Sequence, residues 1–271
     1  MAGRLTGQHA LVTGGGSGIG LATAELFAAD GAAVTLVGRN RERLEDAARQ
    51  ITAGAEVAIE VADVADEAAI EAAILAADAR RPLTIAVANA GTGDIAPLVA
   101  TDSERWRAVL EVNLTGCMHT FKHAARAIGR AGGGALCAIS SIAGVRTHRF
   151  MHAYSVSKAG IDMLVRTSAD ELGIAGIRVN SVCPGLVDTE LARGLFENEA
   201  VLNDYLECMP LGRTGVTADI AQAVRFLCGP ESSWITGVSL SVDGGHHLRR
   251  GPNYESFARA MYGDDLVDGR F

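Results

Sequence analysis

The chain is poor in lysine, in long apolar runs and in positive charge overall. Its only lysines are Lys122 and Lys158, and the net charge of −8 argues against a nucleic-acid surface. No apolar run approaches the roughly 20 residues that a membrane-spanning helix needs. The start of the chain also lacks the basic region and cleavage site of a secretory signal. We therefore expect a cytoplasmic protein that has no nucleic-acid or membrane partner.

Cysteine pairs at regular spacings are also missing. The five cysteines are scattered along the chain and contain no C-x-x-C pair. Disulfide frameworks and zinc sites depend on such spacings, so we expect reduced and mostly buried thiols. His246 and His247 are adjacent but have no further candidate ligands, and we predict no metal site.

Short apolar runs alternate with helical patterns along most of the chain. These runs show little polar alternation, which is typical of strands that are covered on both faces. The rhythm predicts an α/β fold with a Rossmann-type, doubly wound parallel sheet of about seven strands, helices on both faces and a single domain. The expected strands are His9–Val12, Ala33–Val37, Val57–Val61, Thr84–Ala88, Ala135–Ser140, Arg178–Val182 and Val238–Ser241. The expected helices are Leu21–Asp30, Arg41–Ile51, Glu67–Ala79, Ser103–Ile128, Tyr154–Leu172 and Thr217–Leu227.

Two segments depart from this rhythm. Residues 186–209 follow a strand with a loose helical pattern, where a substrate lid would lie in such a fold. After a domain of residues 1–245, residues 246–271 form a C-terminal extension that we expect to pack on the domain or on a neighbouring subunit. There Asn253 is expected to cap a short helix that carries Tyr254, Phe257 and Met261 on one face.

A glycine-rich run, residues 13–20, directly follows the first expected strand and opens the first helix. Glycine allows a tight turn and lets backbone N–H groups approach phosphate oxygens, and the helix N-terminus adds a positive dipole end. The run lacks the Gly-Lys-Ser/Thr ending of a nucleoside-triphosphate loop. It therefore predicts a dinucleotide site.

The end of the second strand indicates which dinucleotide is bound. NAD sites usually place an acidic residue here, whereas this chain has Gly38 followed by Arg39. An arginine can bind the 2′-phosphate of NADP. We therefore predict NADP(H), with NAD(H) as the alternative if Arg39 is only a solvated surface residue.

Tyr154 and Lys158 are four residues apart and would share one face of a helix. A tyrosine has a pKa of about 10, and a nearby ammonium group lowers it by favouring the phenolate. In a chain that otherwise uses arginine, a lysine at this spacing suggests a proton-transfer pair. The alternative is a simple pair on a helix surface.

From about residue 5 to residue 245 the chain resembles the short-chain dehydrogenase/reductase family, in its single-domain branch. The match runs in family order, although Ala88 replaces the commoner asparagine before the N-A-G motif. Ser141 lies thirteen residues before Tyr154, the usual spacing, which favours it over Ser140. The other matching positions are Thr13, Gly14, Gly18, Gly20, Asp63, Val64, Asn89, Ala90, Gly91, Asn113, Pro184, Gly185, Thr189 and the closing Asp243-Gly244-Gly245.

The resemblance implies an NAD(P)-dependent oxidoreductase that acts on a carbonyl or secondary alcohol. It implies that Tyr154 is the general acid/base, Lys158 its partner, Ser141 the group that binds the reacting oxygen, and Asn113 the holder of a water beside Lys158. It also implies a homotetramer. With the residues above, the expected cofactor site comprises Gly14, Gly16, Ser17, Gly18, Ile19, Gly20, Arg39, Asp63, Val64, Asn89, Ala90, Gly91, Tyr154, Lys158, Pro184, Gly185, Val187 and Thr189.

The substrate stays open. The expected lid carries Leu191, Leu195, Phe196, Tyr205 and Met209, which favour a small or apolar ketone or alcohol. Gly93 and Asp94 are expected to edge the same cavity, and His148, Arg149 and His152 are candidates for a polar substrate group or for solvated loop positions. One alternative is reduction of 3-oxoacyl groups on an acyl carrier protein, although the acidic chain shows no basic entrance for such a partner. An alternative of another class is a non-catalytic NADP-binding regulator or scaffold.

Overall fold

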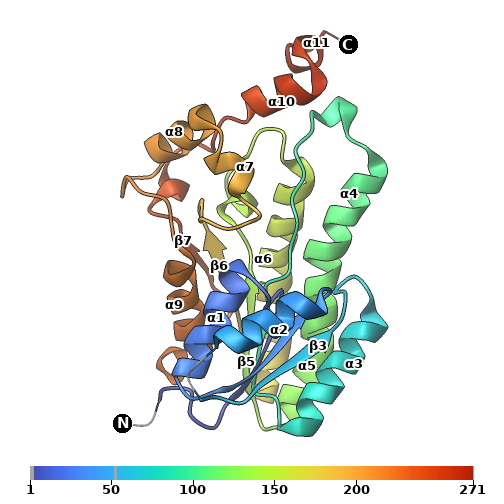
Figure 1. Cartoon of the computed structure of the whole chain (residues 1–271), viewed down its shortest axis with the longest axis vertical. Coiled ribbons are helices and arrows are strands. Elements are labelled where there is room, and N and C mark those ends of the chain that lie inside the picture. The colour runs from blue at the N-terminus through green and yellow to red at the C-terminus, as the bar shows by residue number, and fades with distance from the viewer. Residues whose placement is uncertain (1–2, 52–53, 271) are drawn as a thin grey trace.

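The computed structural model describes residues 3–51 and 54–270, in which seven parallel strands form one sheet between two layers of helices (Figure 1). The strand order is β3-β2-β1-β4-β5-β6-β7, and the predicted doubly wound sheet is confirmed. The strands are β1 (His9–Thr13), β2 (Ala33–Gly38), β3 (Val57–Val61), β4 (Ile85–Ala88), β5 (Gly134–Ile139), β6 (Ile177–Pro184) and β7 (Ser239–Val242).

The helices follow the predicted pattern with one correction. The expected helix over residues 103–128 is interrupted by a π-helical turn at Glu111–Thr115. Such turns are rare and are often found at functional sites. The α-helices are α1 (Gly18–Ala29), α2 (Arg41–Gln50), α3 (Glu67–Arg80), α4 (Ser103–Leu110), α5 (Gly116–Arg130), α6 (His152–Leu172), α7 (Arg193–Phe196), α8 (Glu199–Cys208), α9 (Thr217–Cys228), α10 (Glu255–Tyr262) and α11 (Asp264–Val267).

Apolar side chains cover both faces of the sheet because successive strand residues point to opposite sides. Leu36 belongs to the core beneath α1, α2 and α9, and the next residue, Val37, belongs to the core beneath α3, α5 and α6. This arrangement explains why the strands read as continuous apolar runs. All five cysteines are buried. No helix within residues 3–51 and 54–270 combines the length and the apolar character that a bilayer crossing requires.

The order of the strands reverses between β1 and β4, and in open α/β sheets ligands bind at the carboxyl ends of the strands at such a point. In Figure 1, α7, α8 and α10 lie above this edge, and the C-terminal residues reach the top of the molecule. These helices enclose a third apolar cluster, which includes Leu186, Tyr205 and Tyr254. α10 begins after Tyr254, which takes the N-cap position expected for Asn253, while Asn253 Oδ1 accepts a hydrogen bond of 2.9 Å from the Glu255 amide.

Candidate active site

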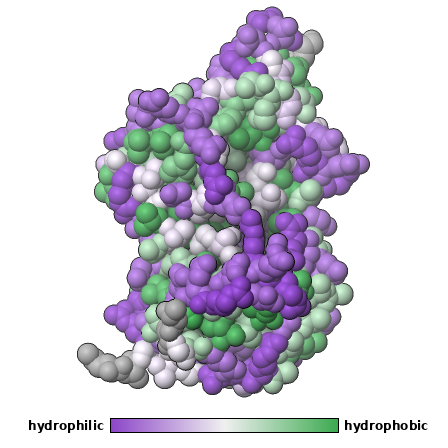
Figure 2. All heavy atoms as spheres, viewed as in Figure 1, coloured by the Kyte–Doolittle hydropathy of each residue, from purple (hydrophilic) through white to green (hydrophobic). Residues whose placement is uncertain are grey.

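A cavity of about 750 Å³ lies at the carboxyl edge of the sheet. Figure 2 shows the corresponding hollow between the lower half of the molecule, with α1 and α2, and the upper half, with α7, α8 and α10. Loops that follow β1, β4, β5 and β6 line it, so the cavity joins the glycine-rich run to Ser141, Tyr154 and Lys158. One continuous space therefore joins part of the expected dinucleotide site to the expected proton-transfer residues, whereas Gly16, Gly20, Arg39, Asp63 and Val64 do not line it.

The glycine-rich loop is packed so closely that side chains do not fit at two of its positions. Gly14 has φ +65°, and a Cβ there would lie 2.7 Å from Asn89 Nδ2. A Cβ on Gly20 would lie 2.3 Å from the carbonyl oxygen of Gly14. Since α1 starts at Gly18, its N-terminal amides face this loop, as required for a phosphate group. The loop therefore fits the pyrophosphate of a dinucleotide.

The end of β4 is hydrogen-bonded directly to this loop. Asn89 Nδ2 donates to the carbonyl oxygens of Thr13, at 2.9 Å, and Gly14, at 3.2 Å. The Thr13 hydroxyl accepts from the amides of Asn89, at 3.0 Å, and Ala90, at 3.2 Å. These four bonds hold two loops that are far apart in the sequence in one fixed arrangement at the point where the strand order reverses.

Arg39 lies just beyond the end of β2, outside the residues that line the cavity. Its side chain is 75% exposed, and its guanidinium lies 3.7 Å from a carboxylate oxygen of Asp63. Asp63 also accepts a hydrogen bond of 3.0 Å from the Ala65 amide. Val64 packs beneath Gly116, where a Cβ would lie 2.8 Å from the Val64 Cβ. The two sequence-predicted adenosine-end groups, Arg39 and Asp63, are thus neighbours at the β2 and β3 ends.

A second arginine near the glycine-rich loop was missed by the sequence analysis. Arg43 donates two hydrogen bonds to the carboxylate of Glu190, at 2.9 and 3.0 Å, and so joins α2 to the segment that follows β6. A Cβ on Gly16 would lie 3.5 Å from the Arg43 Cβ, which places this ion pair beside the loop. Nothing in the sequence links two residues so far apart, and only the folded chain brings them together.

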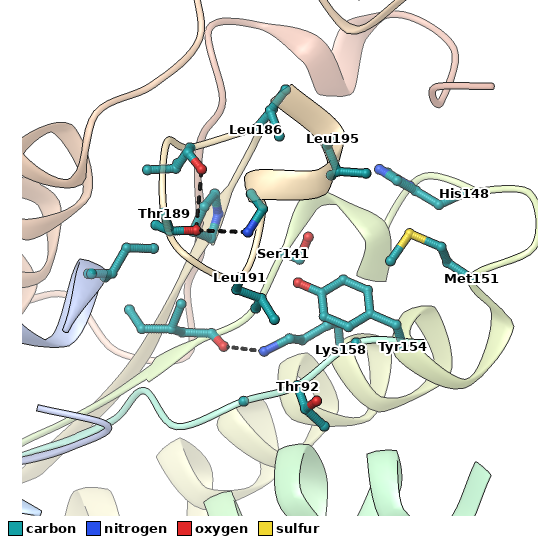
Figure 3. A pocket seen from close by; sticks show the side chains of 18 of the residues that line it. Thr92, Ser141, His148, Met151, Tyr154, Lys158, Leu186, Thr189, Leu191 and Leu195 are labelled. Atoms are coloured by element: carbon teal, nitrogen blue, oxygen red, sulfur yellow. Dashed lines mark hydrogen bonds between the residues drawn. The ribbon is translucent and has the colours of Figure 1, made fainter. Parts of the chain in front are cut away.

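Ser141, Tyr154 and Lys158 meet inside the cavity, as predicted. Figure 3 shows the hydroxyl oxygens of Ser141 and Tyr154 facing each other, with the Lys158 side chain beside the tyrosine ring. The Lys158 ammonium lies 5.5 Å from the centre of that ring and donates a 2.8 Å hydrogen bond to the carbonyl oxygen of Ile139. Ser140 is buried and donates to the Lys158 carbonyl at 3.1 Å, which leaves Ser141 as the serine opposite Tyr154.

The expected downward shift of the Tyr154 pKa is wrong for the protein alone. Burial raises the pKa of Tyr154, and the hydrogen bond with Ser141 only partly opposes this shift. Burial also lowers the pKa of Lys158 to about 8. The physical reason is that burial disfavours the charged phenolate, while the Lys158 ammonium donates its hydrogen bond to the Ile139 carbonyl. At neutral pH the phenol is therefore protonated and the amine is still mostly charged.

Asn113 lies in the π-helical turn between α4 and α5 and is buried. Its side-chain oxygen accepts from the Thr92 amide at 2.8 Å, and its Nδ2 donates to the Thr92 carbonyl at 2.9 Å and to Ser157 Oγ at 3.0 Å. A Cβ on Gly91 would lie 3.3 Å from Asn113 Oδ1 and 3.7 Å from Lys158 Nζ. Asn113 is therefore next to the β4 loop and close to Lys158, but it does not line the cavity.

The lid and the tail both contribute to the cavity wall, together with Gly93 and Asp94, whose place there is confirmed. Of three candidate polar residues, only His148 lines it. Arg149 pairs with Glu255 at 2.6 Å, and His152 hydrogen-bonds to Thr101. The tail stripe that we predicted as a packing face also faces the cavity. The lid and tail residues that line it are Leu186, Val187, Thr189, Glu190, Leu191, Ala192, Leu195, Tyr205, Tyr254, Phe257 and Met261.

Comparison with known proteins agrees with this geometry. Residues 14–247 match the family described as enoyl-(acyl carrier protein) reductase. A galactitol 2-dehydrogenase (L-tagatose-forming) from Cereibacter sphaeroides is 38% identical over 90% of this chain and 96% of its own length. The chain belongs to the short-chain dehydrogenase/reductase family. Members of this family bind nicotinamide cofactors, and this chain is an oxidoreductase of that family.

Two further short-chain dehydrogenase/reductase relatives cover nearly the whole fold. A 3-oxoacyl-[acyl-carrier-protein] reductase from Chlamydia muridarum is 36% identical over 89% of this chain and 98% of that protein. The structure of a short-chain type dehydrogenase/reductase from Mycobacterium ulcerans superposes with a TM-score of 0.95 at 39% identity and covers 98% of both chains. Since that match spans 98% of this chain, the similarity extends into the C-terminal extension.

In this short-chain dehydrogenase/reductase, Lys158→Met is expected to raise the free energy of unfolding by about 2 kcal/mol at pH 7. Burial holds the Lys158 pKa near 8, against 10.5 ordinarily, which corresponds to about 3 kcal/mol, and loss of the bond to Ile139 removes about 1 kcal/mol. As pH rises from 8 to 10.5 the native state loses its proton first, so the wild-type protein gains stability and the difference shrinks. Urea unfolding at pH 7 and pH 10, with the exposed Lys122→Met as control, measures this. A lower stability of Lys158→Met at pH 7 would contradict it.

Proposed function

We propose that this chain transfers a hydride between a nicotinamide cofactor and a carbonyl or secondary alcohol. The observation that carries the proposal is the meeting of Ser141, Tyr154 and Lys158 in the cavity that also contains the glycine-rich loop. The bound cofactor supplies the acceptor or donor of the hydride. A binding protein without catalysis has no need for a phenol beside a buried lysine at the end of a dinucleotide cleft.

Tyr154 is proposed as the group that moves the proton. In reduction it donates its phenolic proton to the carbonyl oxygen, and in alcohol oxidation it accepts the hydroxyl proton as the C–H bond gives up its electron pair. Ser141 binds the same oxygen and positions it. Lys158 stabilises the phenolate that reduction leaves behind, and Asn113 holds a water beside Lys158 that connects the site to bulk solvent.

For the cofactor we propose NADP(H), bound in the groove from Gly14 to Thr189. The loop after β1 holds the pyrophosphate, Asp63 and Val64 hold the adenine, and the β4 and β6 loops hold the nicotinamide end. Arg39 supports NADP over NAD(H), because it is exposed and free to turn from Asp63 to a 2′-phosphate.

Fluorescence titration with NADPH and with NADH tests this choice. Arg39→Ala is expected to weaken NADPH binding about 10- to 100-fold, because one charge-assisted interaction of roughly 1.5–3 kcal/mol is lost, and to leave NADH binding unchanged. Arg41→Ala is the matched control, since Arg41 is similarly exposed and interacts with Glu45 on its own helix. Tighter binding of NADH by the wild-type protein would overturn the NADP assignment.

As substrate we propose a small or apolar ketone or alcohol. Leu186, Leu195 and Met151 line the cavity near Tyr154 and supply apolar contact (Figure 3). The acyl-carrier alternative has a relative in its favour, the Chlamydia muridarum reductase. An acidic carrier protein needs free positive charge near the entrance. Here Arg105 is paired with Asp94, and Arg149 with Glu255, so the alternative receives less support.

We also propose that the chain forms a homotetramer through α4–α5 and α6. Val156 and Met163 on α6 are 48% and 54% exposed, and a partner helix would cover these apolar side chains. Multi-angle light scattering at micromolar concentration is expected to give four times the chain mass. A monomer under these conditions would contradict the proposal.

A further inference from the structure

A polar cluster lies in the cavity wall formed by the lid and the tail. Tyr205 comes from α8, Tyr254 immediately precedes α10, and His148 belongs to the loop between β5 and α6. All three line the cavity and are at most 6% exposed. We refer to these three residues as the Tyr-Tyr-His cluster. No step of the proposed hydride transfer uses it, although burying three polar side chains requires that their hydrogen bonds be satisfied.

The hydrogen bonds within the cluster leave one donor and one acceptor without a partner. The hydroxyl groups of Tyr205 and Tyr254 are bonded to each other, so one phenolic proton is used and the other is still available. His148 Nδ1 lies 3.0 Å from the carbonyl oxygen of Arg146, which can only accept, so Nδ1 carries the proton and Nε2 is an acceptor. In Figure 3 the His148 ring is directed towards Leu195 and the interior of the cavity.

The cluster is also electrically neutral at physiological pH. Burial lowers the pKa of His148 to about 4 and raises the pKa values of Tyr205 and Tyr254 well above their ordinary range. Among the described residues that line the cavity, the only cations are Lys158 and Arg105, and Arg105 is paired with Asp94. A carboxylate or phosphate at the cluster would therefore be buried without a counter-charge, which is strongly unfavourable.

On the cavity side the surroundings of the cluster are apolar, while the buried His246 packs behind it with its ring centre 5.5 Å from that of Tyr205. Rings of Tyr205 and Tyr254 pack edge to face with centres 6.1 Å apart, and Phe257 lies 6.4 Å from Tyr254. Leu195 and Met261 complete this part of the wall. A ligand here meets hydrocarbon on most sides and one neutral polar point. This pattern is typical of sites that recognise an apolar molecule by a single hydrogen-bonding group.

We infer that the Tyr-Tyr-His cluster binds a second hydroxyl group of the substrate, so that the substrate class is a neutral, largely apolar diol or hydroxy ketone. This inference rests on the proposed function. A hydroxyl both donates and accepts, and it therefore satisfies the spare phenolic proton and His148 Nε2 together. A ketone at the same place satisfies only the donor, and a carboxylate introduces an unpaired charge. Tyr154 and Ser141 hold the reacting oxygen while the cluster fixes the far end of the molecule.

The test compares matched alcohols on three skeletons: cyclohexane, decalin and a sterol. For each skeleton, kcat/KM with NADP or NAD is measured for the mono-ol, for diols of different spacing and for the hydroxy acid. We expect the best diol of a skeleton to exceed its mono-ol about tenfold and the hydroxy acid to be the poorest, because two neutral hydrogen bonds contribute roughly 1–3 kcal/mol. Tyr254→Phe and Tyr205→Phe should each reduce the diol/mono-ol ratio towards one.

Tyr262→Phe is the matched control, because it removes a tyrosine hydroxyl from the C-terminal extension without changing the Tyr-Tyr-His cluster. Tyr262 lies at the end of α10 and donates to the Ile95 carbonyl at 3.2 Å, but it does not line the cavity. Its replacement should leave the diol/mono-ol ratio unchanged. The inference would be overturned by equal kcat/KM values for diols and mono-ols. It would also be overturned if the diol/mono-ol ratio fell as much in Tyr262→Phe as in Tyr254→Phe and Tyr205→Phe. In either case, oxidation of alcohols would still support the proposed function. Failure to oxidise any alcohol on the three skeletons would contradict both the inference and the proposed function.

Discussion

Tyr154→Phe is expected to lower kcat about 10³-fold, with the Kd for NADPH changed less than twofold. General acid–base groups contribute about 10²–10⁴ in rate, and the change removes only the oxygen that carries the transferred proton. Tyr154 is half-buried in the cavity wall and phenylalanine keeps the ring, so the packing against Lys158 stays intact. Steady-state assays with a ketone and an alcohol, together with NADPH fluorescence titration, give the two values.

The same variant separates an enzyme from a non-catalytic regulator or scaffold. If the chain serves only to sense or carry NADP, Tyr154→Phe should retain its cellular activity, because cofactor binding is preserved. Tyr262→Phe loses the same atom from the half-buried end of α10 and serves as the control for turnover. A Tyr154→Phe protein that turns over at the wild-type rate would disprove the assignment of Tyr154 as the proton-transfer group.

The sheet could be predicted from the sequence because most of its strands are covered on both faces. Leu36 and Val37 point into different cores, and such continuous apolar runs are recognisable without a structure. The glycine-rich loop was equally readable, because its place between the first strand and the first helix is visible in the sequence itself. The break at Glu111–Thr115 was not, because a π-helical turn of five residues is too short to change the apolar pattern recognisably.

The parts that escaped prediction depend on contacts between distant segments. The Arg43–Glu190 pair spans the groove between α2 and the lid, and the Tyr205–Tyr254 pair joins the lid to the tail. The direction of the Lys158 ammonium was another such case. The spacing of Tyr154 and Lys158 placed them on one helix face, but it did not show that the Lys158 amine is hydrogen-bonded to the Ile139 carbonyl on β5, or that burial raises the Tyr154 pKa.

The helix that opens the dinucleotide site gives the second large prediction: Gly20→Ala should weaken NADPH binding about 100-fold. The new Cβ would lie 2.3 Å from the Gly14 carbonyl oxygen and 2.5 Å from Asn89 Nδ2, and no flexible side-chain end is available to yield on the Gly14 side. The loop must shift, which disturbs the amides that face the pyrophosphate. Each hydrogen bond from a loop amide to the pyrophosphate is charge-assisted and contributes roughly 1.5 kcal/mol or more. Loss of two of them therefore corresponds to about 100-fold weaker NADPH binding.

Gly129→Ala is the matched control, because it makes the same change within a helix. A Cβ there meets only Ile177 Cδ1, at 4.0 Å, so alanine should fit and stabilise α5 by up to about 1 kcal/mol. Overpacking at Gly20 should instead lower the free energy of unfolding by about 1–3 kcal/mol. Thermal unfolding and NADPH titration of both variants give the comparison. If Gly20→Ala binds NADPH as tightly as Gly129→Ala, the close approach of α1 to the β1 and β4 loops does not hold the cofactor, and the pyrophosphate site must lie elsewhere in the cavity.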